Sequence, residues 1–302
     1  MIERVLASAA VLATPLLLAA MGGLINRRGG LVNIGLEGMM LVGAFVAALT
    51  SAATGSWVFA LVAAAAAGGV VGLLFSWSVT RLRANEIIAG FGLNIFVAGV
   101  IGFLLTRLFG SSSSLRPEGM VQLPHLDLPL IADVPVLGAV LSGRDPLTWA
   151  TWALVPFVAW VLSRTRWGLH LRATGAAPTA ALAIGLPVLR IRDTSTVIAG
   201  VLAGLGGAHL TLGIVGLFHD SMIAGRGFIA FAAVYFGRAR PLPTAAACAL
   251  FAIFDAMQVR LQGQNVPAEL VQTLPYVVVV AVLAFTGIRA ARTRTSQVVT
   301  AP

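Results

Sequence analysis

The sequence predicts an all-α polytopic membrane protein, and three observations lead to that prediction. Of the 302 residues, 58% are hydrophobic and only 10% are charged, and the mean hydropathy is +0.94. Several apolar runs reach the roughly 20 residues that a helix needs to cross a bilayer. The basic residues lie mainly in short segments between these runs. Soluble domains are about a quarter charged, so this composition excludes a soluble domain. The high apolar content excludes a disordered chain. A disulfide scaffold is excluded because Cys248 is the one cysteine.

Nine apolar segments predict about nine transmembrane helices. They are residues 5–22, 31–53, 57–80, 86–108, 147–163, 194–217, 227–237, 243–259 and 270–288. The first is expected to be a retained helix rather than a signal peptide, since Pro15 interrupts it and no small-residue cleavage site follows. Segment 227–237 is short for a span and is expected to be tilted, re-entrant or extended into its flanks. Eight and ten spans therefore stay open as alternatives.

Two hydrophilic stretches interrupt the single transmembrane domain predicted for residues 1–302. Residues 110–146 begin with serines and contain five prolines, which predicts an external loop with little regular helix. Residues 164–193 are basic and alanine-rich. The breakers Gly175, Pro178, Gly185 and Pro187 leave room for one short helix near 178–184.

The arginines predict the orientation of the chain. All 20 basic residues are arginine, and cytoplasmic loops of membrane proteins are enriched in such residues. If the 164–192 loop is cytoplasmic, 14 arginines lie inside and 6 outside. This favours an external N-terminus and a cytoplasmic C-terminus. A P-loop requires a lysine, and the chain has none, so any ATP hydrolysis must take place on another chain.

Small residues recur at helix-packing spacing. Gly68 and Gly72 form one GxxxG pair, and Gly200 and Gly204 form another. Small residues let helix backbones approach closely within a membrane. Packing inside one subunit is favoured over a specific dimer face.

The sequence contains no arrangement typical of a catalytic or metal site. His125, His170, His209 and His219 match no metal-ligand spacing, and Cys248 lies in an alanine-rich span. We expect no catalytic residues, no metal and no cofactor.

Three polar residues in or beside apolar segments are candidates for a translocation path: Asn33, Glu37 and Asn94. A charged carboxylate at bilayer depth costs roughly 2.5–3.5 kcal/mol on insertion scales, so Glu37 should face protein or water. Asn33 is surrounded by glycines, which indicates an irregular helix entrance of the kind that lines cavities. Glu37 either lines such a cavity or caps and positions a helix. Asp255 and Gln258 are weaker candidates of the same kind, and Glu86 is expected to favour a helix N-terminus.

Four stretches resemble a known family in order and spacing. They are similar to bacterial ABC-importer permeases of the ribose/branched-chain amino acid superfamily. The stretches are GGLINRRGGLVNIGLEGMMLVGAF (22–45), ANEIIAGFGLN (84–94), LRATGAAPTAALAIGLPVLRIR (171–192), and GRGFIAFAAVYFGRARP (225–241) with QGQNVPAELVQTLPYVVVV (262–280). The resemblance is stronger to the permeases that import nucleosides with a basic-membrane-protein-type lipoprotein, and within these to the shorter permease. It covers almost the whole chain except residues 110–146.

The resemblance implies an ABC importer permease fold and a multi-pass subunit in the bacterial plasma (inner) membrane. Its implied partners are a second, homologous permease, two ATP-binding subunits and an extracytoplasmic substrate-binding lipoprotein that delivers a nucleoside. A short helix in the cytoplasmic coupling loop, 164–193, would dock on the ATP-binding subunit. The matching positions are Gly168, Arg172, Ala173, Gly175, Pro178, Ala180, Ala181 and Gly185. Ala176 and Ala177 replace the Glu-Asn pair usual in relatives, so polar details of docking differ here.

Three alternatives to a nucleoside permease stay open at this point. A simple-sugar permease would share the fold and loops, although NIGLEG (33–38) resembles the nucleoside branch. An ion-coupled secondary transporter would need embedded acids, and only Glu37 and Asp255 qualify. A membrane enzyme lacks an acid–base or metal cluster.

Overall fold

The computed structural model describes residues 2–110, 114–126 and 143–261. Seven helices within these ranges are long and apolar enough to cross a membrane. They belong to α1 (Ile2–Arg28), α2 (Leu36–Thr54), α3 (Trp57–Thr80), α4 (Glu86–Phe109), α7 (Pro146–Arg164), α10 (Val188–His209) with the π-helical turn η1 (Leu210–Val215), and α12 (Pro241–Leu261). The remaining elements are α8 (Arg166–Ala176), α9 (Pro178–Ala183), α11 (Arg226–Phe236), and the short strands β1 (Ser114–Leu115) and β2 (Phe218–His219).

These elements confirm the prediction of a helical polytopic protein, while the count of nine spans stays a prediction. Segment 227–237 corresponds to α11, which has 11 residues and is too short to span. Segment 270–288 lies outside the described residues. The predicted helix near 178–184 is present as α9, but α8 was not predicted, and α10 begins at Val188 rather than near residue 194.

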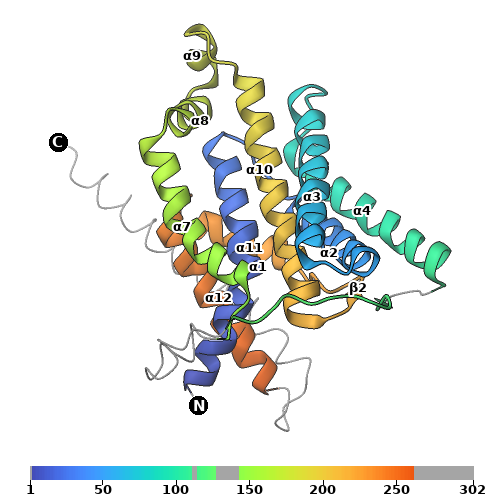
Figure 1. Cartoon of the computed structure of the whole chain (residues 1–302). Coiled ribbons are helices and arrows are strands. Elements are labelled where there is room, and N and C mark those ends of the chain that lie inside the picture. Colours follow the sequence, from blue (N-terminus) through green and yellow to red (C-terminus); the bar gives the residue numbers. More distant parts are fainter. Residues whose placement is uncertain (1, 111–113, 127–142, 262–302) are drawn as a thin grey trace.

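Helix α10 lies at the centre of the fold and packs against α1, α2 and α3 (Figure 1). The two predicted GxxxG pairs face each other. A Cβ added at Gly68 would overlap the carbonyl oxygen of Gly200, and one added at Gly204 would overlap that of Ala64. The glycines therefore serve packing within this chain, as the sequence favoured.

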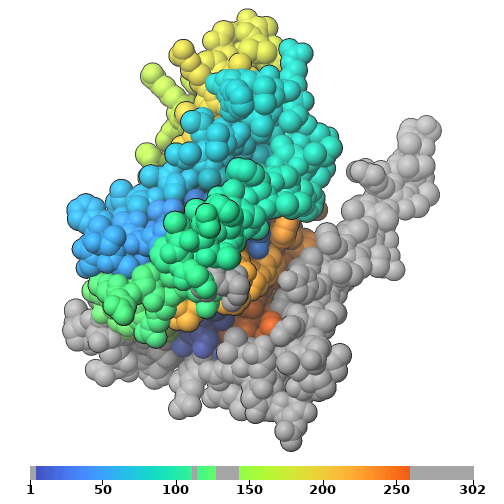
Figure 2. All heavy atoms as spheres, turned by 90° about the vertical axis from the view of Figure 1, so that its right-hand side faces the viewer, coloured from blue at the N-terminus to red at the C-terminus, as the bar shows by residue number. Residues whose placement is uncertain are grey.

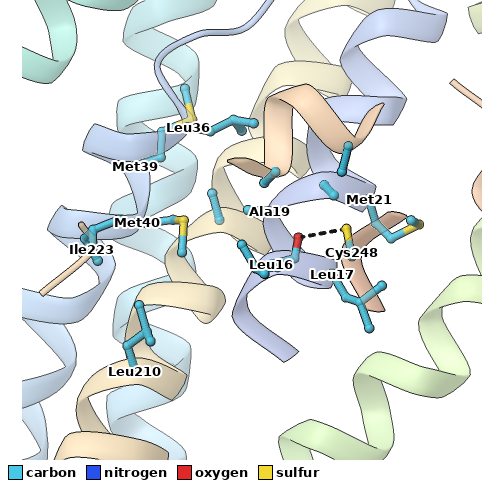
Figure 3. Close-up of a cluster of buried hydrophobic side chains, with 14 of the residues drawn as sticks. Leu16, Leu17, Ala19, Met21, Leu36, Met39, Met40, Leu210, Ile223 and Cys248 are labelled. Carbon is cyan, nitrogen blue, oxygen red and sulfur yellow. Dashed lines mark hydrogen bonds between the residues drawn. The ribbon is translucent and has the colours of Figure 1, made fainter. Parts of the chain in front are cut away.

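The main core is formed around α1, by buried side chains of α1, α2, α11 and α12 together with some from α3, α4, α7 and α10. Figure 3 shows Leu16 and Met21 of α1 beside Cys248 of α12, with Met39 and Met40 of α2 on the other side. The Cys248 Sγ lies 3.8 Å from the carbonyl oxygen of Leu16. The cysteine is fully buried, so it is a packing residue.

Helix α4 exposes an apolar face. Its exposed side chains include Ile88, Ile95, Phe96 and Phe103, each at least 64% accessible. Figure 2 shows α4 running across one face of the molecule. Such a large apolar surface requires lipid or another membrane subunit as its neighbour.

The described part of the predicted external loop lies against the end of the bundle opposite α8 and α9. β1 pairs with β2 in antiparallel register, Ser114 with His219 and Leu115 with Phe218. The Ser51 Oγ also donates to the carbonyl of Val121, at 2.7 Å. Residues 114–126 and 143–145 are strand, turn and extended chain, in agreement with the low helix content predicted for this loop.

A buried polar cluster fixes the start of α7 to the end of α10. Asp145 accepts from the Thr148 backbone N–H at 2.9 Å, and its other carboxylate oxygen lies 3.0 Å from the His209 Nε2. Thr14 of α1 extends the cluster through its hydroxyl, 3.1 Å from that of Thr148. Burial acts to raise the pKa of Asp145, but the hydrogen bonds from His209 and Thr148 and the charge of His209 outweigh it and hold the pKa below its usual 3.8.

Asp145→Asn is expected to lower the thermal unfolding midpoint at neutral pH. The lowered pKa means that ionised Asp145 stabilises the folded state above pH 3.8, and that this contribution is lost as the pH falls from 3.8 toward the folded pKa. The difference between wild type and variant should therefore shrink between about pH 5 and about pH 3. Thermal unfolding of the purified chain in detergent measures this, with the exposed Asp220→Asn as control. A difference that stays constant over this range would contradict the assignment.

Candidate functional site

The chain between α1 and α2 is extended and buried. Leu31 is fully inaccessible and Asn33 is 2% accessible. Buried, non-helical backbone in a membrane protein must find hydrogen-bond partners inside the protein. Residues 29–38, which we call the broken-helix segment, obtain them from helices α1 and α4 and from the side chain of Asn33.

Helix α4 supplies two of these partners. Its first-turn Glu86 accepts from the Val32 N–H at 2.6 Å. Asn94, two turns later, donates to the carbonyl of Ile34 at 3.0 Å and accepts from the N–H of Gly38 at 2.8 Å. One side chain thus satisfies a carbonyl before α2 and an N–H in its first turn.

Asn33 ties the broken-helix segment to α1 and α10. Its side-chain oxygen accepts from the Gly35 N–H at 3.0 Å, and its amide nitrogen donates to the Asn26 Oδ1 at 3.1 Å. Asn26 in turn donates to the hydroxyl of Thr196 on α10, at 2.7 Å. This buried polar chain fixes the position at which α2 begins.

Glu37 connects α2 to α11. Its two carboxylate oxygens accept from the N–H groups of Gly225 and Gly227, at 2.8 and 2.7 Å. These donors lie at the N-terminus of α11, where a negative charge is favoured by the helix dipole and by the unpaired N–H groups.

The contacts explain the GRGFIA pattern (225–230). Gly225 adopts a left-handed conformation with φ 78°. A Cβ on Gly227 would lie 2.6 Å from the Cα of Glu37, so this position must be glycine for the helices to meet. Arg226 between them pairs with Asp255 of α12 at 3.0 Å. The pattern therefore joins α2, α11 and α12.

The structure thus brings the three predicted path residues, Asn33, Glu37 and Asn94, into one region. In the described contacts each bonds to protein backbone or to a neighbouring side chain at a helix start, which favours the capping interpretation of Glu37. Asn26 and Thr196 were missed by sequence reasoning. Asn26 lies on α1 and Thr196 on α10, and no residue spacing within either segment indicates that these two side chains face each other.

The predicted coupling residues lie in α8, in α9 and in the turns that bound them, at one end of the bundle (Figure 1). Thr165 caps α8 by accepting from the Gly168 N–H at 3.0 Å. Arg172 donates back to the carbonyl of Gly168 at 3.3 Å. A Cβ on Gly168 would overlap the carbonyl of Val161, so this glycine lets α8 fold back on the end of α7.

Helix α9, the predicted coupling helix, is short and closely bounded. Pro178 occupies its first turn, and Gly185 ends it with φ 83°. Ala181 is 2% accessible and faces the protein, whereas Ala180 lies on the exposed side. The carbonyl of Ala173 accepts from the N–H of Ala177 at 3.0 Å, which closes α8 immediately before α9 begins.

Similarity to known proteins identifies the family. The family model described as branched-chain amino acid transport system / permease component matches residues 5–283. The nucleoside ABC transporter permease protein NupC of Lactococcus lactis is 33% identical, covering 94% of this chain and 92% of the relative. The guanosine ABC transporter permease protein NupQ of Bacillus subtilis is 31% identical, with 92% and 89% covered. A putative glucose ABC transporter permease protein of Haloferax volcanii is 32% identical, with the same coverage.

Such permeases are transport components that work with ATP-binding and substrate-binding partners, so the predicted ABC permease is confirmed and the membrane-enzyme alternative is not supported. The apolar helices agree with a multi-pass membrane protein. The chain therefore belongs to the family of branched-chain amino acid transport system permease components, as the membrane-embedded subunit of an ABC transporter.

Proposed function

We propose that this permease forms the translocation path of an ATP-driven importer for nucleosides. The supporting observation is similarity over more than 90% of the chain to permeases named for nucleoside and guanosine transport. The proposed assembly contains this chain, a second homologous permease, two ATP-binding subunits and a substrate-binding lipoprotein outside the membrane.

The proposed mechanism uses two regions of this chain. The coupling segment, residues 164–193, receives motion from the ATP-binding subunit on the cytoplasmic side. Helix α10 continues from this segment into the centre of the bundle, and its Ser195 and Thr196 lie within hydrogen-bond distance of Asn26, which holds the broken-helix segment. A displacement of α8 and α9 would thus reach the helix starts at Asn33, Glu37 and Asn94. Alternation between outward- and inward-facing states then needs no chemistry in this chain.

The proposed orientation places α8 and α9 in the cytoplasm of a bacterial cell, with the C-terminus on the same side. Arg27, Arg28 and Arg172 lie together at this end of the bundle, as the positive-inside rule requires of a cytoplasmic face. Residues 110–146 are accordingly the external loop. Residues 262–302, which include the C-terminus, lie outside the described residues.

Uptake measurements test the nucleoside assignment. Cells lacking this chain should lose ATP-dependent uptake of labelled guanosine, and the wild-type gene should restore it. Excess unlabelled nucleoside should compete, whereas glucose and ribose should not.

A simple-sugar permease is the second and less supported candidate, because one relative, named as a putative glucose permease, is 32% identical. Guanosine uptake unaffected by loss of the chain, together with lost glucose or ribose uptake, would establish that candidate instead.

A further inference from the structure

A cavity of about 280 Å³ lies at the end of the molecule that carries α8 and α9. It is formed where the end of α1, helix α8 and the turn between α11 and α12 meet. Three arginines line it: Arg27 and Arg28 from α1, and Arg172 from α8. The wall is completed by four small residues, Gly30, Gly175, Ala176 and Ala239.

Neutral groups hold these three arginines in place. The Arg28 Nε donates to the carbonyl of Ala239 at 2.7 Å, and the Arg172 Nε to that of Gly168 at 3.3 Å. The Arg27 guanidinium lies 5.3 Å from the centre of the Tyr235 ring. Among the residues that the structure describes, no carboxylate forms an ion pair with any of the three. Their charges are therefore not neutralised within that part of the chain.

Two further arginines add positive charge beside the cavity. Arg240 follows Ala239 and, like Arg172, repels Arg28. Arg192 of α10 lies close to Gly30. Its Nη2 is 3.5 Å from the position that a Cβ would occupy on that glycine. Its Nε is buried and has no hydrogen-bond partner in the described ranges. A buried, unpaired donor on a charged side chain is costly unless an anion completes the site.

The shape of the cavity limits what can enter. A Cβ on Gly175 would overlap the carbonyl of Arg28, and Gly30 has φ 82°, so both glycines bring backbone close to the arginines. The volume suits a phosphate group with its ester, whereas a helix with side chains is about 10 Å across. Arginine guanidinium groups match phosphate oxygens through paired N–H donors.

We propose that this cavity binds the phosphate of an anionic phospholipid headgroup in the cytoplasmic leaflet. Arg27 and Arg28 end the α1 span, which is the depth of the headgroups, and the partly exposed Tyr235 beside Arg27 is typical of that interface. The leaflet follows from the orientation proposed above. The bound phosphate would bridge α1, α8 and the α11–α12 turn, and so hold the base of the coupling segment.

Lipid binding to the purified full-length chain, with its partner subunits where they co-purify, tests the proposal. Native mass spectrometry would compare phosphatidylglycerol with phosphatidylcholine, and inorganic phosphate would be titrated separately. Wild type should retain phosphatidylglycerol selectively. The double variant R28Q/R172Q should bind it about 25-fold more weakly, because each arginine that lines the cavity should contribute about fivefold through its contact with the anionic headgroup. The single variant R27Q tests the third arginine, and R166Q, an exposed arginine also on α8, is the matched control and should bind as wild type.

Three outcomes would overturn the proposal. Equal binding of both lipids by wild type would exclude an anionic-lipid site, whatever the variants do. Displacement of phosphatidylglycerol by inorganic phosphate at micromolar concentration would indicate a site for free phosphate. A double variant that keeps its lipid selectivity but loses the ATP-binding subunit would assign the arginines to an acidic surface of that protein. Guanosine uptake is not a readout here, so failure of this proposal is distinct from failure of the nucleoside assignment.

Discussion

Gly68→Ala is expected to lower the free energy of unfolding by about 2 kcal/mol, because side-chain atoms forced into a packed interior cost typically 1–3 kcal/mol. The new Cβ would overlap the carbonyl oxygen of Gly200 and lie 3.0 Å from the Cα of Gly204. Both contacts are with backbone, so no side-chain rotation relieves them. The helices α3 and α10 would have to separate along their length.

The same substitution elsewhere in the chain provides a matched control. Gly99 lies in α4 with nothing within 4 Å of an added Cβ. Gly99→Ala should be neutral or stabilise the protein by up to about 1 kcal/mol, because alanine favours a helix over glycine. Denaturation of the purified chain in detergent compares the two variants. Equal effects at both positions would show that the α3–α10 contact contributes nothing specific.

The glycine pairs illustrate what a sequence can predict about a membrane fold. Spacing placed Gly68 with Gly72 and Gly200 with Gly204 on single helix faces, because residues four apart lie on one side of a helix. It favoured packing within one subunit. Which two faces meet depends on the three-dimensional arrangement, and neither sequence segment contains that information.

The short helices show the opposite limit. Breakers at Pro178 and Gly185 were sufficient to predict α9, since each has a local conformational cause. Helix α8 was missed because it is amphipathic and contains Gly175 near its end, so hydropathy and breakers both indicated a loop. Its stability comes from Thr165 at its start and from the contact of Gly168 with α7.

The polar residues of the broken-helix segment were found for a physical reason, but their partners were not. An acid in an apolar run is costly, so Glu37 stood out from sequence alone. Its partners are backbone N–H groups of Gly225 and Gly227, nearly 190 residues away. Backbone groups leave no side-chain signature, and therefore the sequence alone leaves both interpretations of Glu37 open.

Substitution of Glu37 distinguishes these two interpretations. Glu37→Gln keeps the shape of the side chain but removes the negative charge, and its amide nitrogen cannot accept from an N–H of α11. Because hydrogen bonds to charged groups contribute about 1.5–3 kcal/mol, the variant should be destabilised by about that amount. Glu37→Ala should cost more, since it removes the acceptors of both Gly225 and Gly227. Helix α11 has 11 residues and depends on such tertiary contacts.

Stability and uptake must be measured on the same preparations. If Glu37 caps α11, unfolding stability and guanosine uptake should fall together, and conditions that restore folding should restore transport. The exposed Glu118→Gln removes the same charge outside this contact and should leave both unchanged. Lost uptake at unchanged stability in Glu37→Gln would instead place the carboxylate on the substrate path. Because the carboxylate holds α11 against α2, we expect the first result: Glu37 supports the path by fixing the two helix starts rather than by contacting the nucleoside.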